Sequence, residues 1–218
     1  MKKILVIMGL LLLAACKPSV MSYDEFLETL EIEAPLEKLR IKNYNTDNIC
    51  TPLLDGAPYL ESILATVEFV RENLGEQFYQ EATAKLEGGI TYNAKKSNRI
   101  SGHYNAHTNT IELYESLFEF GCIEEVASTL IHEMVHALQQ ERHRRPGKQL
   151  GEHNLLGKEK DALLAELEAE LYQLYLGDKL KLTGFAHTKK IVNLANERRI
   201  QFNELMSTPG NPLTAVFQ

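Results

Sequence analysis

The chain has 218 residues, of which 44% are hydrophobic, 8% aromatic and 24% charged. This composition is ordinary for a globular protein and excludes a disordered or fibrous one. The 30 acidic residues exceed the 23 lysines and arginines, giving a formal net charge of -7 at pH 7. Binding to nucleic acid requires a basic surface, so the sequence predicts no nucleic-acid partner.

The first fifteen residues resemble a bacterial lipoprotein signal peptide. Two lysines precede an apolar run over residues 4–13, which is shorter than the roughly 20 residues needed to span a bilayer. Small residues before Cys16 resemble the lipobox, in which the cysteine is acylated and becomes the mature N-terminus. We therefore expect cleavage before Cys16 and a lipid anchor on it, the alternative being an ordinary signal peptide with Cys16 nearby by chance. Lys17 stands where an aspartate is associated with inner-membrane retention, which favours an outer-membrane anchor. We expect the protein to face the periplasm, with exposure at the cell surface as the alternative.

With Cys16 acylated, Cys50 and Cys122 form an even pair in an oxidising compartment. A disulfide between them would close a loop of about 70 residues and stabilise the fold by roughly 4 kcal/mol. Two buried free thiols are the alternative.

Residues 16–56 are expected to form a tether and N-terminal segment, and residues 57–218 a single domain. The N-terminal segment has one helical pattern, over 23–32, followed by sequence rich in proline, asparagine and aspartate. Apolar periodicity then predicts helices over residues 58–74, 76–86, 123–145, 158–176 and 187–206. Strands rich in β-branched and aromatic residues are expected over residues 90–92, 100–104 and 110–114, with the last two as a hairpin. The predicted fold class is α+β, mostly helical, with a small sheet before the helix that starts near residue 123.

That helix contains the motif His132-Glu133-Met134-Val135-His136. Side chains four residues apart project from the same helix face, so both histidines can bind one zinc ion. Glu133 lies beside His132 around the helix, where its carboxylate can take a proton from a water molecule on that zinc. A helix whose two histidines merely line a core is the alternative.

These residues, with their uncharged internal and flanking positions, resemble the zincin metallopeptidases. The metzincin pattern is absent, because Gln139 stands where its turn glycine would be and Arg142 where its third ligand, a histidine, would be. The gluzincin pattern implies a glutamate ligand from a downstream helix, which Glu166 matches, and an acid four residues later that orients a histidine ligand, which Glu170 matches. Alternatives for the third ligand stay open at Glu170, Glu168, Asp161, Glu159 and His153.

The resemblance also implies an edge strand that binds extended substrate, for which 110–114 and 100–104 both qualify. A donor should stabilise the oxyanion, and the sequence does not choose among Tyr104, Tyr172, Tyr175, His153 and His187. His103 and His107 are expected to be turn or surface residues.

The sequence therefore predicts a lipid-anchored zinc metallopeptidase of the bacterial cell envelope, with one Zn2+ per chain and a protein or peptide substrate. A catalytically inactive zinc-binding envelope lipoprotein, and a hydrolase acting on another amide or ester, are the alternatives. The sequence does not fix the oligomeric state.

Overall fold

The computed structural model describes residues 20–29, 51, 53, 59–94, 101–119, 122–143, 155–180 and 185–207. The described chain is mostly helical with one small sheet, which confirms the α+β class. The predicted signal peptide, Cys16 and Cys50 lie outside these residues. Cys122 is disulfide-bonded, but its pairing with Cys50 stays a prediction. Within the described segments, every helix is too short or too polar to pass through a bilayer.

The helices follow the predicted periodicity but differ from it at their ends. In chain order they are α2 (Tyr23–Thr29), α3 (Tyr59–Leu74), α4 (Glu76–Thr83), α5 (Glu115–Phe118), α6 (Ile123–His143), α7 (Leu155–Leu180) and α8 (Phe185–Ser207). Both α7 and α8 extend beyond the predicted ranges, α4 ends earlier, and the short α5 was not predicted.

The sheet has the strand order β1-β3-β2, formed by β1 (Gly89–Asn93), β2 (Gly102–Asn105) and β3 (Thr110–Tyr114). The predicted hairpin is confirmed, since β2 and β3 pair antiparallel with His103 opposite Glu112. Its turn places Asn109 at φ 48°, a left-handed conformation that asparagine tolerates. β1 pairs with β3 in parallel, so β3 is the central strand and β2 lies at an edge.

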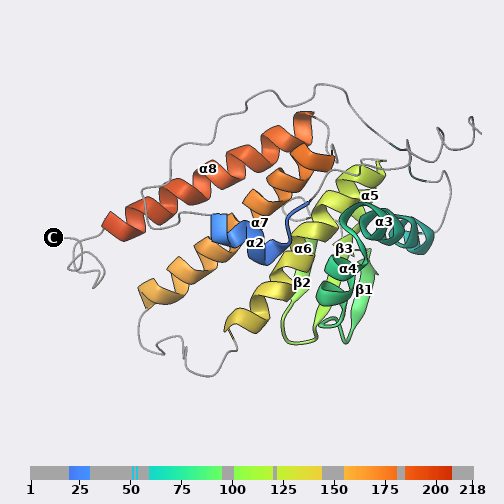
Figure 1. The fold of residues 1–218 in the computed structure, drawn as a ribbon, viewed down its shortest axis with the longest axis horizontal. Helices are drawn as coiled ribbons and strands as arrows, with labels where there is room; N and C mark the ends of the chain where they lie inside the picture. Colours follow the sequence, from blue (N-terminus) through green and yellow to red (C-terminus); the bar gives the residue numbers. More distant parts are fainter. Residues whose placement is uncertain are drawn as a thin grey trace, which may run out of the picture.

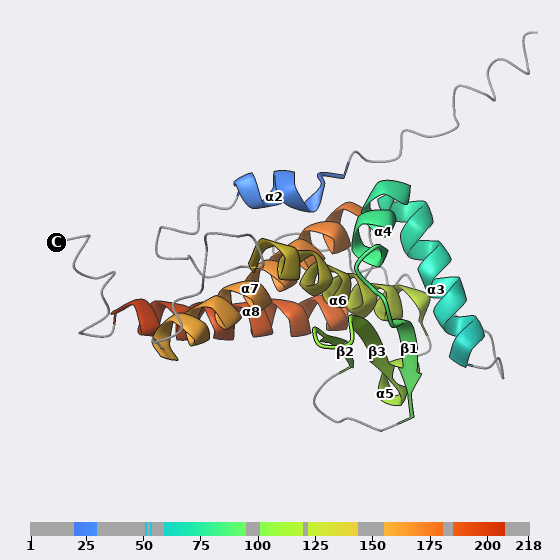
Figure 2. The same cartoon turned by 90° about the horizontal axis from the view of Figure 1, so that it is seen from below.

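Helix α6 forms the centre of the molecule. Its side chains Leu130, Ile131, Met134 and Val135 are fully buried in the main core cluster. The sheet and α3 pack against α6, and α7 packs beside it (Figure 1). Figure 2 shows the sheet and α2 on opposite sides of the layer formed by α6, α7 and α8. A second, smaller cluster joins α8 to α7.

Candidate metal centre

Helix α6 carries both histidines of the motif on one face. Because the side chains are four residues apart, the rings lie one above the other, with centroids 4.7 Å apart and planes nearly perpendicular. The Nε2 atoms of His132 and His136 point toward each other across 3.1 Å. Both side chains are 17% exposed, so the pair is largely buried but still reaches the surface.

Glu166 reaches the same point from α7. Its carboxylate oxygens lie 3.7 Å from Nε2 of His132 and 3.6 Å from Nε2 of His136. These three side chains form a group that could hold a metal ion, with all donor atoms within 4.8 Å of one another. Tetrahedral zinc with bonds of about 2.0–2.1 Å separates its donors by about 3.3–3.4 Å, so the spacing fits after shifts of a few tenths of an ångström. Two imidazoles and one carboxylate are also a donor set of catalytic zinc sites.

The other candidates for the third ligand do not converge on this point. Glu168 accepts hydrogen bonds from Tyr23 and Gln139, on the side of α7 that faces α2. Asp161 lies on α7 outside the group of donors. The side chain of Glu159 and the whole of His153 lie outside the described residues.

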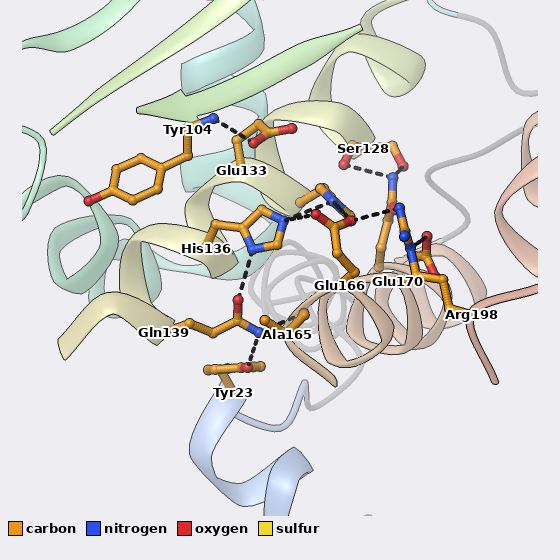
Figure 3. A network of polar contacts seen from close by, with 12 residues as sticks. Tyr23, Tyr104, Ser128, Glu133, His136, Gln139, Ala165, Glu166, Glu170 and Arg198 are labelled. Atoms are coloured by element: carbon orange, nitrogen blue, oxygen red, sulfur yellow. Dashed lines mark hydrogen bonds and ion pairs between the residues drawn. The ribbon is translucent and has the colours of Figure 1, made fainter. Parts of the chain in front are cut away.

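Arg198, from α8, contacts Glu166 and Glu170 together (Figure 3). Its guanidinium lies 3.1 Å from the Glu166 carboxylate and donates to Glu170 across 3.0 Å. Burial raises the pKa of Glu166, but His132, His136 and Arg198 outweigh burial and bring this pKa down to about 2. Glu166 is therefore a carboxylate at any working pH. This contact was not predicted, because nothing in the sequence relates α8 to the motif.

Glu170 is placed differently from the expectation that it orients a histidine. One carboxylate oxygen pairs with Arg198, and the other, Oε2, is buried with no hydrogen-bond partner among the described residues. Burial raises the pKa of Glu170 to about 7, against the opposing effect of Arg198. Its negative charge also contributes to raising the pKa of His132. The structure thus gives Glu170 a contact with α8 rather than a hydrogen bond to a metal-ligand histidine.

The hydrogen-bond partner of the His136 Nδ1 atom is Gln139. The Gln139 Oε1 atom lies 2.8 Å from Nδ1 of His136, one helical turn away on α6. Burial and the neighbouring His132 lower the pKa of His136, so that its ring is neutral near pH 7. At His132 burial also lowers the pKa, but the carboxylates of Glu166, Glu133 and Glu170 outweigh burial and leave this pKa raised. The spacing of three residues could have indicated Gln139 from the sequence.

Glu133 is buried between α6 and the edge strand β2. Its Oε2 accepts a hydrogen bond of 2.8 Å from the backbone N–H of Tyr104 (Figure 3). This bond from the backbone of β2 fixes the position of the Glu133 carboxylate. The carboxylate is therefore oriented by the fold and not by another side chain.

The predicted oxyanion donors are engaged elsewhere or not described. The Tyr104 hydroxyl donates to Asn109, the Tyr172 hydroxyl donates to the Met21 carbonyl, and the Tyr175 hydroxyl accepts from the Met21 N–H. His103 and His107 are exposed in the hairpin, as expected for surface residues. His153 and the side chain of His187 lie outside the described residues.

Comparison of the chain with known proteins finds a match to one protein family. No curated protein and no solved structure matches the chain. The matching family model covers residues 70–154, a segment that begins in α3, includes the motif of α6 and ends before Glu166. By this match, residues 70–154 are similar to the SprT-like family, a zincin-like family associated with metallopeptidases.

Proposed function

We propose that this chain is a zinc-dependent metallopeptidase of the gluzincin type. The observation that carries the proposal is the convergence of His132, His136 and Glu166 from two helices, with Glu133 held next to the pair. The similarity of residues 70–154 to a zincin-like family supports the same reaction class. Two imidazole nitrogens among the three ligands favour zinc over magnesium or calcium, which prefer oxygen ligands alone.

Each residue then has a distinct task. A zinc ion in this site would acidify a water molecule and polarise the carbonyl of the scissile peptide bond. Glu133 accepts a proton from the attacking water and later gives it to the leaving amine. Because its Oε2 is held by the Tyr104 N–H, we assign the proton to Oε1. Glu166, already ionised, needs no deprotonation to act as a ligand.

The edge strand β2 supports a peptide as the substrate. Since β3 pairs with strands on both sides, the alternative that 110–114 binds substrate is excluded. In β2 the Tyr104 N–H points toward α6 rather than toward β3. This N–H is occupied by Glu133, so an extended peptide would pair with the other outward backbone groups of β2, beside the motif.

The test combines zinc content and hydrolysis in four purified full-length proteins: the parent, Glu133→Gln, Glu166→Ala and Asp161→Ala. We expect about one zinc per chain in the parent and in Glu133→Gln, with hydrolysis of labelled casein or a quenched peptide library lost in Glu133→Gln. Glu166→Ala should lose most of its zinc because two histidines alone bind it weakly. Elemental mass spectrometry and fluorescence measure the two quantities.

Asp161→Ala is the matched control, since it removes a carboxylate from the same helix outside the donor group. An unchanged zinc content in Glu166→Ala would assign the third ligand to another residue. Loss of zinc in a His153→Ala variant would then identify His153 as that ligand. Zinc binding without hydrolysis by the parent would favour an inactive zinc-binding lipoprotein. A folded parent that binds no zinc would overturn the proposal.

We further propose that the protein is held at the envelope membrane by lipid on Cys16. Cys16 precedes the first described residue, Val20, by four positions, so an extended linker spans at most about 14 Å. Met21 follows at once and is hydrogen-bonded to α7 through Tyr172 and Tyr175. This short connection would hold the side of the molecule that carries α2 toward the lipid.

A Cys16→Ser variant tests the anchor. Expressed in a bacterium fed an alkyne fatty acid, the parent should incorporate the label and partition into detergent, whereas Cys16→Ser should carry no label and remain in the aqueous phase. Phase partitioning followed by mass spectrometry of the N-terminal peptide measures both. A parent without lipid, or a labelled Cys16→Ser, would contradict the proposal.

A further inference from the structure

The side chain of Gln139 connects the candidate metal centre to the N-terminal helix. Gln139 is 3% exposed, and its amide is surrounded by polar atoms from three elements. Its Nε2 donates to the Ala165 carbonyl at 2.8 Å, to the Tyr23 hydroxyl at 3.0 Å and to the Glu168 carboxylate at 3.2 Å. Figure 3 shows this chain of contacts running from His136 through Gln139 to Tyr23.

These contacts fix which way the amide points. The carbonyl of Ala165 and the carboxylate of Glu168 can only accept hydrogen bonds, so the group that faces them must be the NH2 group. A rotated amide would place its oxygen against both acceptors inside a buried site. The amide oxygen of Gln139 is therefore directed at His136, where it lies 2.8 Å from Nδ1.

The orientation of the amide in turn fixes the tautomer of His136. A carbonyl oxygen accepts hydrogen bonds only, so Nδ1 of the neutral ring must carry the proton. The lone pair is then on Nε2, the atom that faces His132 and Glu166. In general, metal binding is strengthened by a hydrogen-bond partner on the ring nitrogen that does not bind the metal, because this partner selects the tautomer of the ligand histidine.

Tyr23 supports this amide from α2. Its hydroxyl donates to Glu168 at 3.0 Å, which leaves its lone pairs to accept from Gln139. Its ring is 4% exposed and packs edge-on against Tyr172 at 5.3 Å. The position of the hydroxyl is thus set by packing on α7, not by the amide that it holds.

We propose that α2 is part of the metal centre, with Tyr23 a positioning residue that acts through Gln139 to hold His136 in the tautomer that binds metal. The inference rests on the proposed zinc site. In this arrangement, metal affinity depends on the docking of α2, which is more than 100 residues away from Gln139 in the sequence. Displacement of α2, which follows the predicted lipid anchor, would remove this support and weaken metal binding.

The experiment measures zinc affinity of the full chain in detergent by competition with a chromophoric chelator. Tyr23→Phe keeps the ring packing and removes only the hydroxyl, and Gln139→Ala removes the amide. We expect affinity to fall about 10-fold in Tyr23→Phe and about 10- to 100-fold in Gln139→Ala. Adding Tyr23→Phe to Gln139→Ala should cause no further loss, because Tyr23 acts through the amide.

Tyr175→Phe is the matched control. It also removes a hydrogen bond between α7 and the N-terminal segment, the one to the Met21 N–H, but it does not contact Gln139. Its zinc affinity should stay within twofold of the parent. Equal losses in Tyr175→Phe and Tyr23→Phe would show that docking alone matters and would overturn the positioning role.

A second readout needs no metal. Nitrogen chemical shifts of the assigned His136 ring, measured by NMR at pH 8 in the zinc-free protein, should show the proton on Nδ1 in the parent and a mixture of tautomers in Tyr23→Phe. A parent with this tautomer but no zinc affinity would overturn the proposed function and the effect of α2 on metal binding, and would leave only the control of the His136 tautomer by Tyr23 and Gln139. Normal zinc affinity and an unchanged tautomer in Tyr23→Phe would overturn the inference and leave the zinc site standing.

Discussion

Gly102 allows the edge strand β2 to lie directly against the motif of α6. A methyl group at this position would be 3.0 Å from Thr129 Cγ2, 3.2 Å from Glu133 Cγ and 3.3 Å from Leu113 Cδ2. These distances are shorter than ordinary carbon contacts, so either β2 or the Glu133 side chain would have to move. The absence of a Cβ at this residue therefore allows β2 to pack closely on α6, including on Glu133.

Gly102→Ala should consequently reduce hydrolysis more than it reduces zinc binding. The shift loosens the hydrogen bond between the Tyr104 N–H and Glu133, and small displacements of a catalytic group cost about tenfold or more in rate. Overpacking should also lower the free energy of unfolding by about 1–3 kcal/mol. Steady-state kinetics, zinc content and denaturant titration on the same preparation measure the three effects.

His103→Ala provides the comparison, because His103 is the next residue of β2 and its side chain is exposed. This variant should keep parental rates and stability. If Gly102→Ala were as active as the parent, the close approach of β2 would have no catalytic consequence.

The residues of the site differ in how far the sequence could indicate them. His132, Glu133 and His136 are adjacent on one helix, so their spacing alone places them together. Glu166 could be selected only by resemblance, because its approach depends on how α7 packs on α6. Arg198 could not be predicted at all, since it reaches Glu166 from a helix whose position is set by the apolar contacts of the second cluster.

At the level of elements, apolar periodicity predicted the long helices because each has one buried face. It was least accurate at helix ends, which hydrogen bonding decides more than periodicity does. In α4, for example, the C-cap residue Ala84 keeps right-handed helical angles and donates its N–H to the Gln80 carbonyl, so no change in residue pattern marks the end of the helix.

The sheet shows a different limit of local patterns. The hairpin of β2 and β3 was predicted because its strands are close in sequence and separated by turn residues. The parallel pairing of β1 with β3 is not local: it brings Ile90 opposite Ile111 and puts β3 in the centre. That arrangement decides which strand is the edge next to α6, and hence which strand is available to a peptide.

For the molecule as a whole, the candidate metal centre joins segments that are distant in sequence. The histidines come from α6, Glu166 from α7, its partner Arg198 from α8, and the support of Gln139 from α2. The described residues that form the site therefore bridge both apolar clusters. A metal ion can contact all three donors only when α6 and α7 are packed together.

Zinc should consequently stabilise the whole fold. At free zinc 100-fold above its dissociation constant, binding to the folded state alone adds about 2.7 kcal/mol to the free energy of unfolding. For a chain of this size the melting temperature should rise by roughly 5–10 °C. Differential scanning calorimetry with buffered zinc, and again after chelation, measures the shift.

Two variants separate this linkage from nonspecific effects of the metal. Glu133→Gln keeps all three donors and should retain the full shift, whereas Glu166→Ala should lose most of it because α7 no longer contributes a ligand. If zinc bound to the parent with no change in melting temperature, the metal would have to bind the unfolded chain equally well. In that case the geometry of α6 and α7 would contribute nothing to affinity, contrary to the convergence of the donors in the folded state.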